Sequence, residues 1–329
     1  MTIINRRTAL AGIGATTAAG TFAKPALAQA AYPNRQITIV SPAAAGSQSD
    51  VFARVLAAPL QQRLGVPVIV ENRGGAGGII GTRAGVSAQP DGYTLVYGSS
   101  SGFIIAPQLR EPLPYVTPRD LTPIAITLGG PSIITVNAKL PIKTPQELVA
   151  SLKANPGKLN LGSHGVGSFS HVAMELFMGE TGTQMAHIPF SGGGPLAAAF
   201  MSATVDIALF DVLSISPQVE AGTARVVAQV GEQRSPLFAN VPLVSETVAP
   251  GVRADYWLGL FAPKGTPAPI VEQMSRAMAA ALAEPAVRSR LTDLGLDPVG
   301  STPPEFSAFF QSEILRWREL VRLSGAVPN

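Results

Sequence analysis

Short apolar runs alternate with amphipathic stretches along most of this chain. The first series has strand-length runs at Ile37 to Val40, Val68 to Val70 and Thr94 to Tyr97, with helical periodicity at 50–63 and 78–87 between them. A second series has strand-like runs at 133–136, 159–161, 185–188, 206–210 and 224–230. A third stretch begins at Trp257 to Phe261 and continues in helices. Strands that alternate with helices predict an α/β fold.

The last helix has the clearest signals. Thr302 and Glu305 form a capping-box pattern with Pro303 in the first turn. Apolar residues then recur with helical spacing on one face, at Phe306, Phe309, Phe310, Ile314, Trp317 and Leu320. This pattern predicts a long helix packed against the core.

Three segments share one order: an apolar run, a glycine- and serine-rich loop, and then a helix. They are Ile37 to Arg54, Leu159 to Phe177 and Met185 to Met201. A helix N-terminus has unpaired backbone N–H groups and a partial positive charge, so it can hold a carboxylate or phosphate without a charged side chain. These segments therefore predict anion binding.

The N-terminus has the layout of an export signal. Arg6 and Arg7 precede an apolar stretch from Ala9 to Phe22, and small residues allow cleavage after Ala28 or Ala30. The paired arginines fit the Sec route and also hint at the twin-arginine route. The apolar core is shorter than the roughly 20 residues that span a membrane. Residues 1–30 are therefore predicted to be a cleaved signal peptide, which places the mature protein in the periplasm.

Charge and composition exclude some classes of partner. The signal contains Arg6, Arg7 and Lys24 and no acidic residue, so the 24 basic and 21 acidic residues of the whole chain become equal in number after cleavage. No basic tract interleaved with aromatics is present, which argues against nucleic-acid binding. The chain has no cysteine, so disulfides are excluded.

Five segments together resemble one family. They are Val70 to Gly78, Pro90 to Leu95, Asn155 to Asn160, His187 to Phe190, and Gly259 to Pro267. Over nearly the whole mature length the chain resembles the extracytoplasmic solute receptors of the tripartite tricarboxylate transporter type, the Bug proteins. The resemblance implies a two-lobed clamshell of the periplasmic-binding-protein kind (type II-like), crossed twice by the chain. One lobe would combine 31–130 with 253–329, and the other would be 131–252.

The resemblance also implies a ligand cleft between the lobes, lined by loops that join strands to helices. In the first loop the candidates are Ala45, Gly46, Ser47, Ser49 and Asp50; the aspartate suits a helix-capping role better than contact with an anion. Taken alone, this loop favours a glycine turn before a capped helix; the resemblance reverses that preference. Two other loops in the first part of the chain supply the candidates Gly77, Ser99 and Ser100.

Three further segments supply candidates for the other side of the cleft. The glycine–serine loop supplies Ser163, Gly165 and Ser168, with His171 in the following helix as a candidate that more often packs than binds. The next loop supplies Phe190, Ser191 and Gly192. Phe190 and Ser191 stand where the family usually has tyrosine and lysine, so the missing cation favours a less anionic ligand than a tricarboxylate. Asp211 either accepts a hydrogen bond from the ligand or braces the lobe.

The sequence also contains partial matches to enzyme, cofactor and metal motifs. Gly98 to Gly102 fits Gly-x-Ser-x-Gly, the pattern of a hydrolase nucleophile elbow at Ser100, and Asp120 with His164, His171 or His187 satisfies the chain order of a triad. Prolines at 107, 112 and 114 leave little room for the helix that an elbow requires. The glycines near Gly75 do not complete a dinucleotide motif, and His171 with Glu175 lacks a third metal ligand.

The sequence thus predicts a non-enzymatic, monomeric receptor without cofactor or metal. It would capture a small mono- or dicarboxylate, aromatic acids included, for a two-component membrane permease or for sensing; a secreted serine hydrolase using Ser100 is the alternative.

Overall fold

The computed structural model describes residues 32–75, 78–109, 113–296 and 298–326. Both sheets and their helices belong to one compact unit that runs from Pro33 to Asn329. The predicted signal peptide, 1–30, and Gly77 lie outside the described residues.

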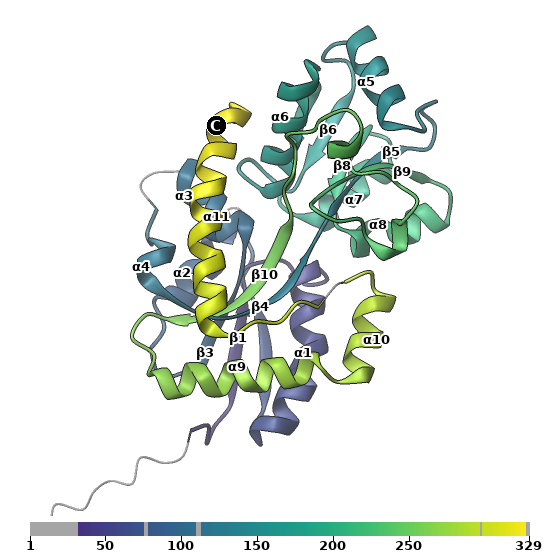
Figure 1. Cartoon of the computed structure of the whole chain (residues 1–329). Coiled ribbons are helices and arrows are strands. Elements are labelled where there is room, and N and C mark those ends of the chain that lie inside the picture. The colour runs from purple at the N-terminus through teal and green to yellow at the C-terminus, as the bar shows by residue number, and fades with distance from the viewer. Residues whose placement is uncertain (1–31, 76–77, 110–112, 297, 327–329) are drawn as a thin grey trace, which may run out of the picture. The chain divides into compact units, whose positions relative to one another are not determined.

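The first sheet has five strands, and one of them comes from far along the chain (Figure 1). Its order is β2-β1-β3-β10-β4. Strand β1 pairs in parallel with β2 and β3, whereas β10 lies antiparallel between β3 and β4. The strands are β1 Ile37–Ser41, β2 Val68–Asn72, β3 Thr94–Ser99, β4 Leu121–Gly130 and β10 Tyr256–Pro263. Sequence reasoning missed β4, whose run is broken by Pro123 and ends in two glycines.

Helices from both ends of the chain surround this sheet. Those from the first part are α1 Gln48–Leu64, α2 Ile79–Val86, a π-helical turn η2 Ser101–Ile105, α3 Ala106–Leu109 and α4 Thr117–Asp120. Those from the last part are α9 Ala268–Leu282, α10 Pro285–Asp293 and α11 Pro303–Ser324. The predicted capping box at the start of α11 is confirmed, since Thr302 Oγ1 accepts from Glu305 N and the Glu305 carboxylate accepts from Thr302 N.

The second sheet also has five strands, all between residues 132 and 230, in the order β7-β6-β8-β5-β9. Strand β6 is parallel to β7 and β8, and β5 is antiparallel to β8 and β9. The strands are β5 Ser132–Asn137, β6 Asn160–Ser163, β7 Ala186–Pro189, β8 Ile207–Phe210 and β9 Ala224–Val230. The helices are α5 Pro145–Ala154, α6 Phe169–Thr181, α7 Gly193–Met201 and α8 Val212–Glu220, with short 3-10 turns η3 Pro236–Phe238 and η4 Val244–Glu246. Two mixed sheets covered by helices confirm the predicted α/β class.

The chain passes between the sheets twice, after β4 and before β10. This topology agrees with a clamshell, although the lobe boundaries at 130/131 and 252/253 stay a prediction. Helix α11 packs on both β4 and α6 (Figure 1). Where α11 meets α6, the ring of Phe169, the first residue of α6, contacts Tyr256 of β10 and Trp317 of α11 edge-on, at 5.7 and 5.5 Å between ring centroids. The C-terminal helix therefore ties the two sheets together.

A buried carboxylate organises the aromatic core beneath α11. Glu313 is 4% exposed, and its Oε2 accepts from Trp257 Nε1 at 3.2 Å and from Trp317 Nε1 at 3.0 Å. Its other oxygen pairs with Arg316 at 3.3 Å. Phe306 and Phe310 pack around Trp257. Buried indole N–H groups need such acceptors, so Glu313 fixes this packing.

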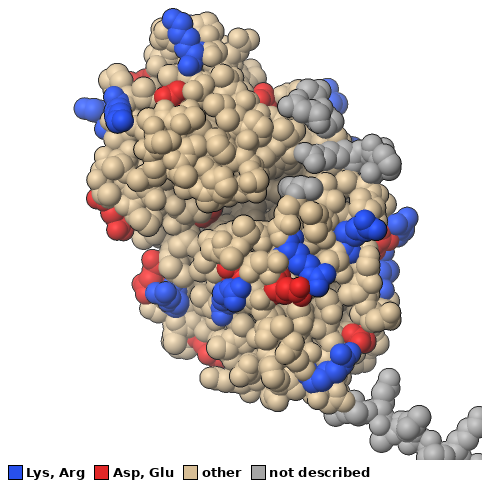
Figure 2. Space-filling view, turned by 180° about the vertical axis from the view of Figure 1, so that it is seen from behind, with Lys and Arg blue, Asp and Glu red and all other residues tan. Residues whose placement is uncertain are grey.

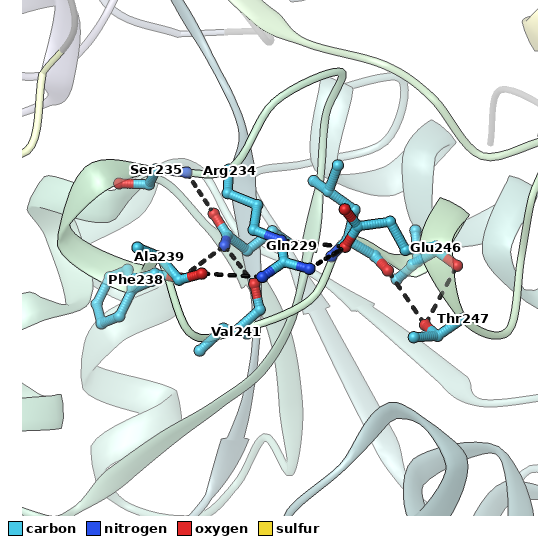
Figure 3. Close-up of polar contacts among 10 residues, drawn as sticks. Gln229, Arg234, Ser235, Phe238, Ala239, Val241, Glu246 and Thr247 are labelled. Atoms are coloured by element: carbon cyan, nitrogen blue, oxygen red, sulfur yellow. Dashed lines mark hydrogen bonds and ion pairs between the residues drawn. The ribbon is translucent and has the colours of Figure 1, made fainter.

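The long return from β9 to β10 is held by a buried amide (Figure 3). Gln229 is fully buried, its Nε2 donates to Phe238 O and Val241 O, and its Oε1 accepts from Ser235 N. Beside it, Arg234 and Glu246 form an ion pair at 2.7 Å. One side chain thus satisfies three backbone groups of a segment that has little regular structure of its own.

Candidate functional site

A cavity of about 280 Å³ opens among loops that come from both sheets. Its walls include the starts of five helices and the start of β10. The residues that line it include Ser47, Ser49, Gly78, Tyr97, Ser99, Phe103, His164, Ser168, Phe169, Ser170, Ser191, Gly192, Gly193, Asp211, Ser214 and Tyr256. The predicted strand–loop–helix segments therefore converge on one space.

The loop before α1 presents hydroxyls. Ser47 caps the helix, because its Oγ accepts from Asp50 N at 3.4 Å, and Ser49 Oγ lies 3.2 Å from Ser47 Oγ. The Asp50 carboxylate accepts from Gly46 N and Arg54 Nε, both at 2.8 Å, and does not line the cavity. The Asp50 carboxylate is thus satisfied by hydrogen bonds within the loop and α1, whereas Ser47 and Ser49 line the cavity.

The start of α6 carries a chain of three hydroxyl and ring groups. Ser168 caps the helix by accepting from His171 N, and its Oγ lies 3.1 Å from Ser170 Oγ. Ser170 Oγ in turn accepts from His164 N at 3.1 Å and lies 3.0 Å from His164 Nδ1. The first amide of the helix, Phe169 N, donates to Ser101 Oγ at 3.0 Å. Ser101, the first residue of η2, thereby meets the N-terminus of α6.

Two helices reach the cavity without a side-chain cap. Gly192 precedes α7 and Gly78 precedes α2, and a glycine at the N-cap position has no side chain that could accept from the first-turn amides. Uncapped first-turn amides are free to donate to a bound anion. Ser191 adds a hydroxyl at the start of α7.

Asp211 caps α8. Its Oδ1 accepts from Ser214 N at 2.9 Å and its Oδ2 from Ser214 Oγ at 2.7 Å. Of the described residues that line the cavity, it is the one carboxylate, and none is lysine or arginine. Both roles that the sequence allowed for Asp211 remain compatible with this position.

Tyr256, the first residue of β10, lines the cavity. Burial raises the pKa of Tyr256, a hydrogen bond with Ser99 opposes the rise, and the charge of Asp211 adds to it. The phenol is therefore protonated at neutral pH and can donate or accept.

His164 is the lining residue that sequence reasoning considered only as a member of a hydrolase triad. Burial lowers the pKa of His164, and the nearby charge of Asp211 partly offsets this. Its ring stands edge-on to Phe210 at 6.2 Å. A histidine in a glycine–serine loop has no distinctive sequence signal, so only the fold could show that it lines the cavity.

The structure places the predicted contact residues in two groups. Ser47, Ser49, Ser99, Ser168, Ser191, Gly192 and Asp211 line the cavity. The lining does not include Ala45, Gly46, Asp50, Ser100, Ser163, Gly165, His171 or Phe190.

The second group has local roles around the same loops. Ser163 Oγ lies 2.6 Å from His187 Nε2, and the rings of His171 and His187 stack at 4.1 Å between centroids. His171 Nδ1 accepts from Gly167 N. Phe190 N donates to Ser163 O, which holds the loop after β7 against the end of β6.

The aromatic walls could not be located from the sequence. Tyr97, Phe103, Phe169 and Tyr256 come from β3, η2, α6 and β10, which are distant in the chain. They give the cavity apolar surface next to its hydroxyls. A mainly apolar pocket with a few fixed polar groups is the usual form of a small-molecule site.

The hydrolase and metal alternatives find no matching geometry. Ser100 is fully buried, and none of the described residues hydrogen-bonds its Oγ. Asp120 instead pairs with Arg119 and accepts from Val116 N. Within the described ranges no three His, Cys, Asp or Glu side chains are grouped as metal ligands. No helix in the same ranges is long and apolar enough to cross a membrane.

Surface charge is mixed. On the face in Figure 2, blue and red residues are interspersed, without a broad area of one sign. This face gives no electrostatic footprint for a nucleic acid.

Comparison with known proteins identifies the family. A family model described as "Tripartite tricarboxylate transporter family receptor" matches residues 52–325. The chain is 35% identical over 324 residues to Protein BugT of Bordetella pertussis, covering 98% of this chain and 99% of BugT.

Solved structures agree over similar lengths. The periplasmic binding protein BugD has 30% identity and a TM-score of 0.84, with 91% of this chain and 100% of BugD covered. An R. palustris protein with adipate has 28% identity and a TM-score of 0.86, covering 91% of this chain and all of that one. MatC from Rhodopseudomonas palustris with bound malate has 32% identity and a TM-score of 0.82, covering 88% and 100%.

These matches confirm the two-lobed periplasmic-binding-protein fold that the sequence predicted. The chain belongs to the tripartite tricarboxylate transporter family receptors, the TctC and Bug proteins, which are binding proteins and not enzymes.

Proposed function

We propose that this receptor captures one small organic carboxylate, a mono- or dicarboxylate, in the cavity between its two sheets. The observation that carries the proposal is the convergence of helix N-termini and serine hydroxyls on a space with no lysine or arginine among its described lining residues. Backbone amides, hydroxyls and ordered water can together hold a carboxylate.

The size of the cavity supports a small ligand. At about 280 Å³ it lies just below the usual range of small-molecule pockets, roughly 300–1,000 Å³. The relatives with bound adipate and malate carry acids of this kind. The aromatic walls suit an acid that also has an apolar part.

Cellular context follows as part of the same proposal. The protein is exported through its N-terminal signal, works in the periplasm as a monomer, and passes its ligand to a membrane permease or reports it to a sensor. The ligand would bind the closed arrangement of the lobes better than the open one and so shift the balance toward closure.

The test is a thermal-shift screen of organic acids followed by calorimetry on those that raise the melting temperature. Adipate, malate, benzoate and nicotinate cover chain length, hydroxylation and aromaticity. We expect at least one acid to bind, and Ser191→Ala to weaken its binding about 10-fold or more, as loss of a hydrogen bond to a charged group requires. Ser202→Ala, at the exposed far end of α7, is the matched control and should leave the affinity unchanged. Failure of every acid to bind would refute the proposal.

A further inference from the structure

The imidazole of His164 is held at one nitrogen and open at the other. Nδ1 lies 3.0 Å from Ser170 Oγ, and the ring stands edge-on to Phe210. Nε2 lies at the N-terminus of α7, 3.7 Å from where a Cβ on Gly193 would stand. His164 and Gly193 both line the cavity. Within the described part of the chain, His164 Nε2 has no hydrogen-bonding partner, whereas Nδ1 has Ser170.

The hydroxyls behind Nδ1 can serve either protonation state. Ser168 Oγ and Ser170 Oγ lie 3.1 Å apart, so Ser170 can turn its proton toward Nδ1 or toward Ser168. In the first arrangement a neutral ring carries its proton on Nε2, facing the cavity. In the second, Nδ1–H donates to Ser170, and a charged ring still keeps a proton on Nε2. The ring can therefore change charge without moving.

Among the described residues that line the cavity, His164 is the side chain that can carry a positive charge. Asp211 at the start of α8 favours the charged ring. Tyr256 on β10 is neutral, because burial raises its pKa. His171, in the first turn of α6, uses its Nδ1 to accept from Gly167 N. A carboxylate that enters would add a second negative charge beside Asp211, with no lysine or arginine in the described lining to balance it.

We propose that His164 contacts the bound carboxylate through Nε2 and takes up a proton as the ligand enters. It is thus a specificity-determining residue that makes capture tighter as the pH falls. This inference rests on the carboxylate-receptor function proposed above.

The direction of the effect follows from linkage. In the empty cavity burial lowers the pKa of His164, so the ring is largely neutral at pH 7. A ligand anion at Nε2 favours the charged ring and raises that pKa. Binding then consumes protons between the two pKa values, and over that interval the dissociation constant must fall as the pH falls.

The experiment is calorimetry with adipate and malate between pH 6.5 and 8, in buffers of different ionisation enthalpy. Simple carboxylic acids are ionised over this range, so any proton that is taken up on binding must be bound by the protein and not by the ligand. We expect a fractional proton taken up per ligand and a several-fold fall in dissociation constant from pH 8 to 6.5. His164→Gln, which keeps a donor but cannot titrate, should bind with neither effect.

The chain has three histidines, which makes the control direct. His187→Gln alters a histidine that does not line the cavity and should retain the proton uptake. Nitrogen-15 spectra of the imidazoles should show the His164 Nε2 signal shift on saturation with either acid.

Each other outcome overturns the inference. Binding with unchanged proton uptake in His164→Gln, or without a shift of the His164 signal, would refute the role of His164 and leave the receptor function intact. No binding of any acid in the screen would refute both.

Discussion

Glu313 offers a sharp test of how the C-terminal helix is held. Its carboxylate accepts from the indoles of Trp257 and Trp317, which lie on β10 and α11. Replacing it with leucine leaves two buried N–H groups without an acceptor. Each such group costs about 1–3 kcal/mol, so Glu313→Leu should lower the free energy of unfolding by about 2–6 kcal/mol. That is a large part of the roughly 5–15 kcal/mol that stabilises a typical domain.

Two variants separate the hydrogen bonds from other effects. Glu313→Gln keeps an acceptor oxygen for the indoles and should cost about 1 kcal/mol. Glu319→Leu, on the same helix, removes a solvent-exposed pair with Arg322 and should leave the free energy of unfolding nearly unchanged. It controls for a leucine placed in α11.

Urea denaturation followed by tryptophan fluorescence measures all three. Trp257 and Trp317 are the two tryptophans of the chain, so the signal reports on this cluster. The denaturation midpoint should shift at constant slope. A midpoint for Glu313→Leu that matches Glu319→Leu would show that the buried carboxylate is not what holds α11.

Two other predictions concern packing and pH. Gly259→Ala would place a Cβ 2.2 Å from Phe306 Cζ, so it should destabilise the fold by about 1–3 kcal/mol, whereas Gly179→Ala, in open space on helix α6, should stabilise it by about 0.5–1 kcal/mol; equal melting temperatures for the two variants would contradict the packing argument. Burial, aided by the neighbouring charge of His171, lowers the pKa of His187 to about 4, from 6.5. As the pH falls, the His187 ring of the unfolded chain is protonated before that of the folded chain. The free energy of unfolding is therefore not reduced by this group above pH 6.5, and it decreases as the pH falls from 6.5 toward 4. Melting temperatures of His187→Gln should decline less steeply over that interval, and parallel curves for the two proteins would exclude His187 as the cause.

Much of the fold follows from local patterns in the sequence. The apolar runs of β1, β3 and β9 and the capped stripe of α11 were predictable because short-range periodicity and capping decide them. Strand β4 was not, because Pro123 and the glycines at its end hide a run that the pairing with β10 stabilises. That pairing joins residues more than a hundred positions apart, and no local signal encodes it.

The candidate site divides in the same way. Serine- and glycine-rich loops before helices can be recognised in the sequence, and Ser47, Ser168 and Ser191 do line the cavity. His164 and Tyr256 line it too, but nothing in their neighbours distinguishes them from packing residues. Their position depends on how the second sheet and β10 meet, which is a property of the whole chain.

The place of β10 in the first sheet has a consequence for how the molecule is made. Strands β3 and β4 have no partner between them until residues 256–263 have been synthesised, after the entire second sheet. Pairing across such a separation closes slowly. An emerging chain therefore keeps a central gap in its first sheet, and completion of that sheet waits for nearly the last part of the polypeptide.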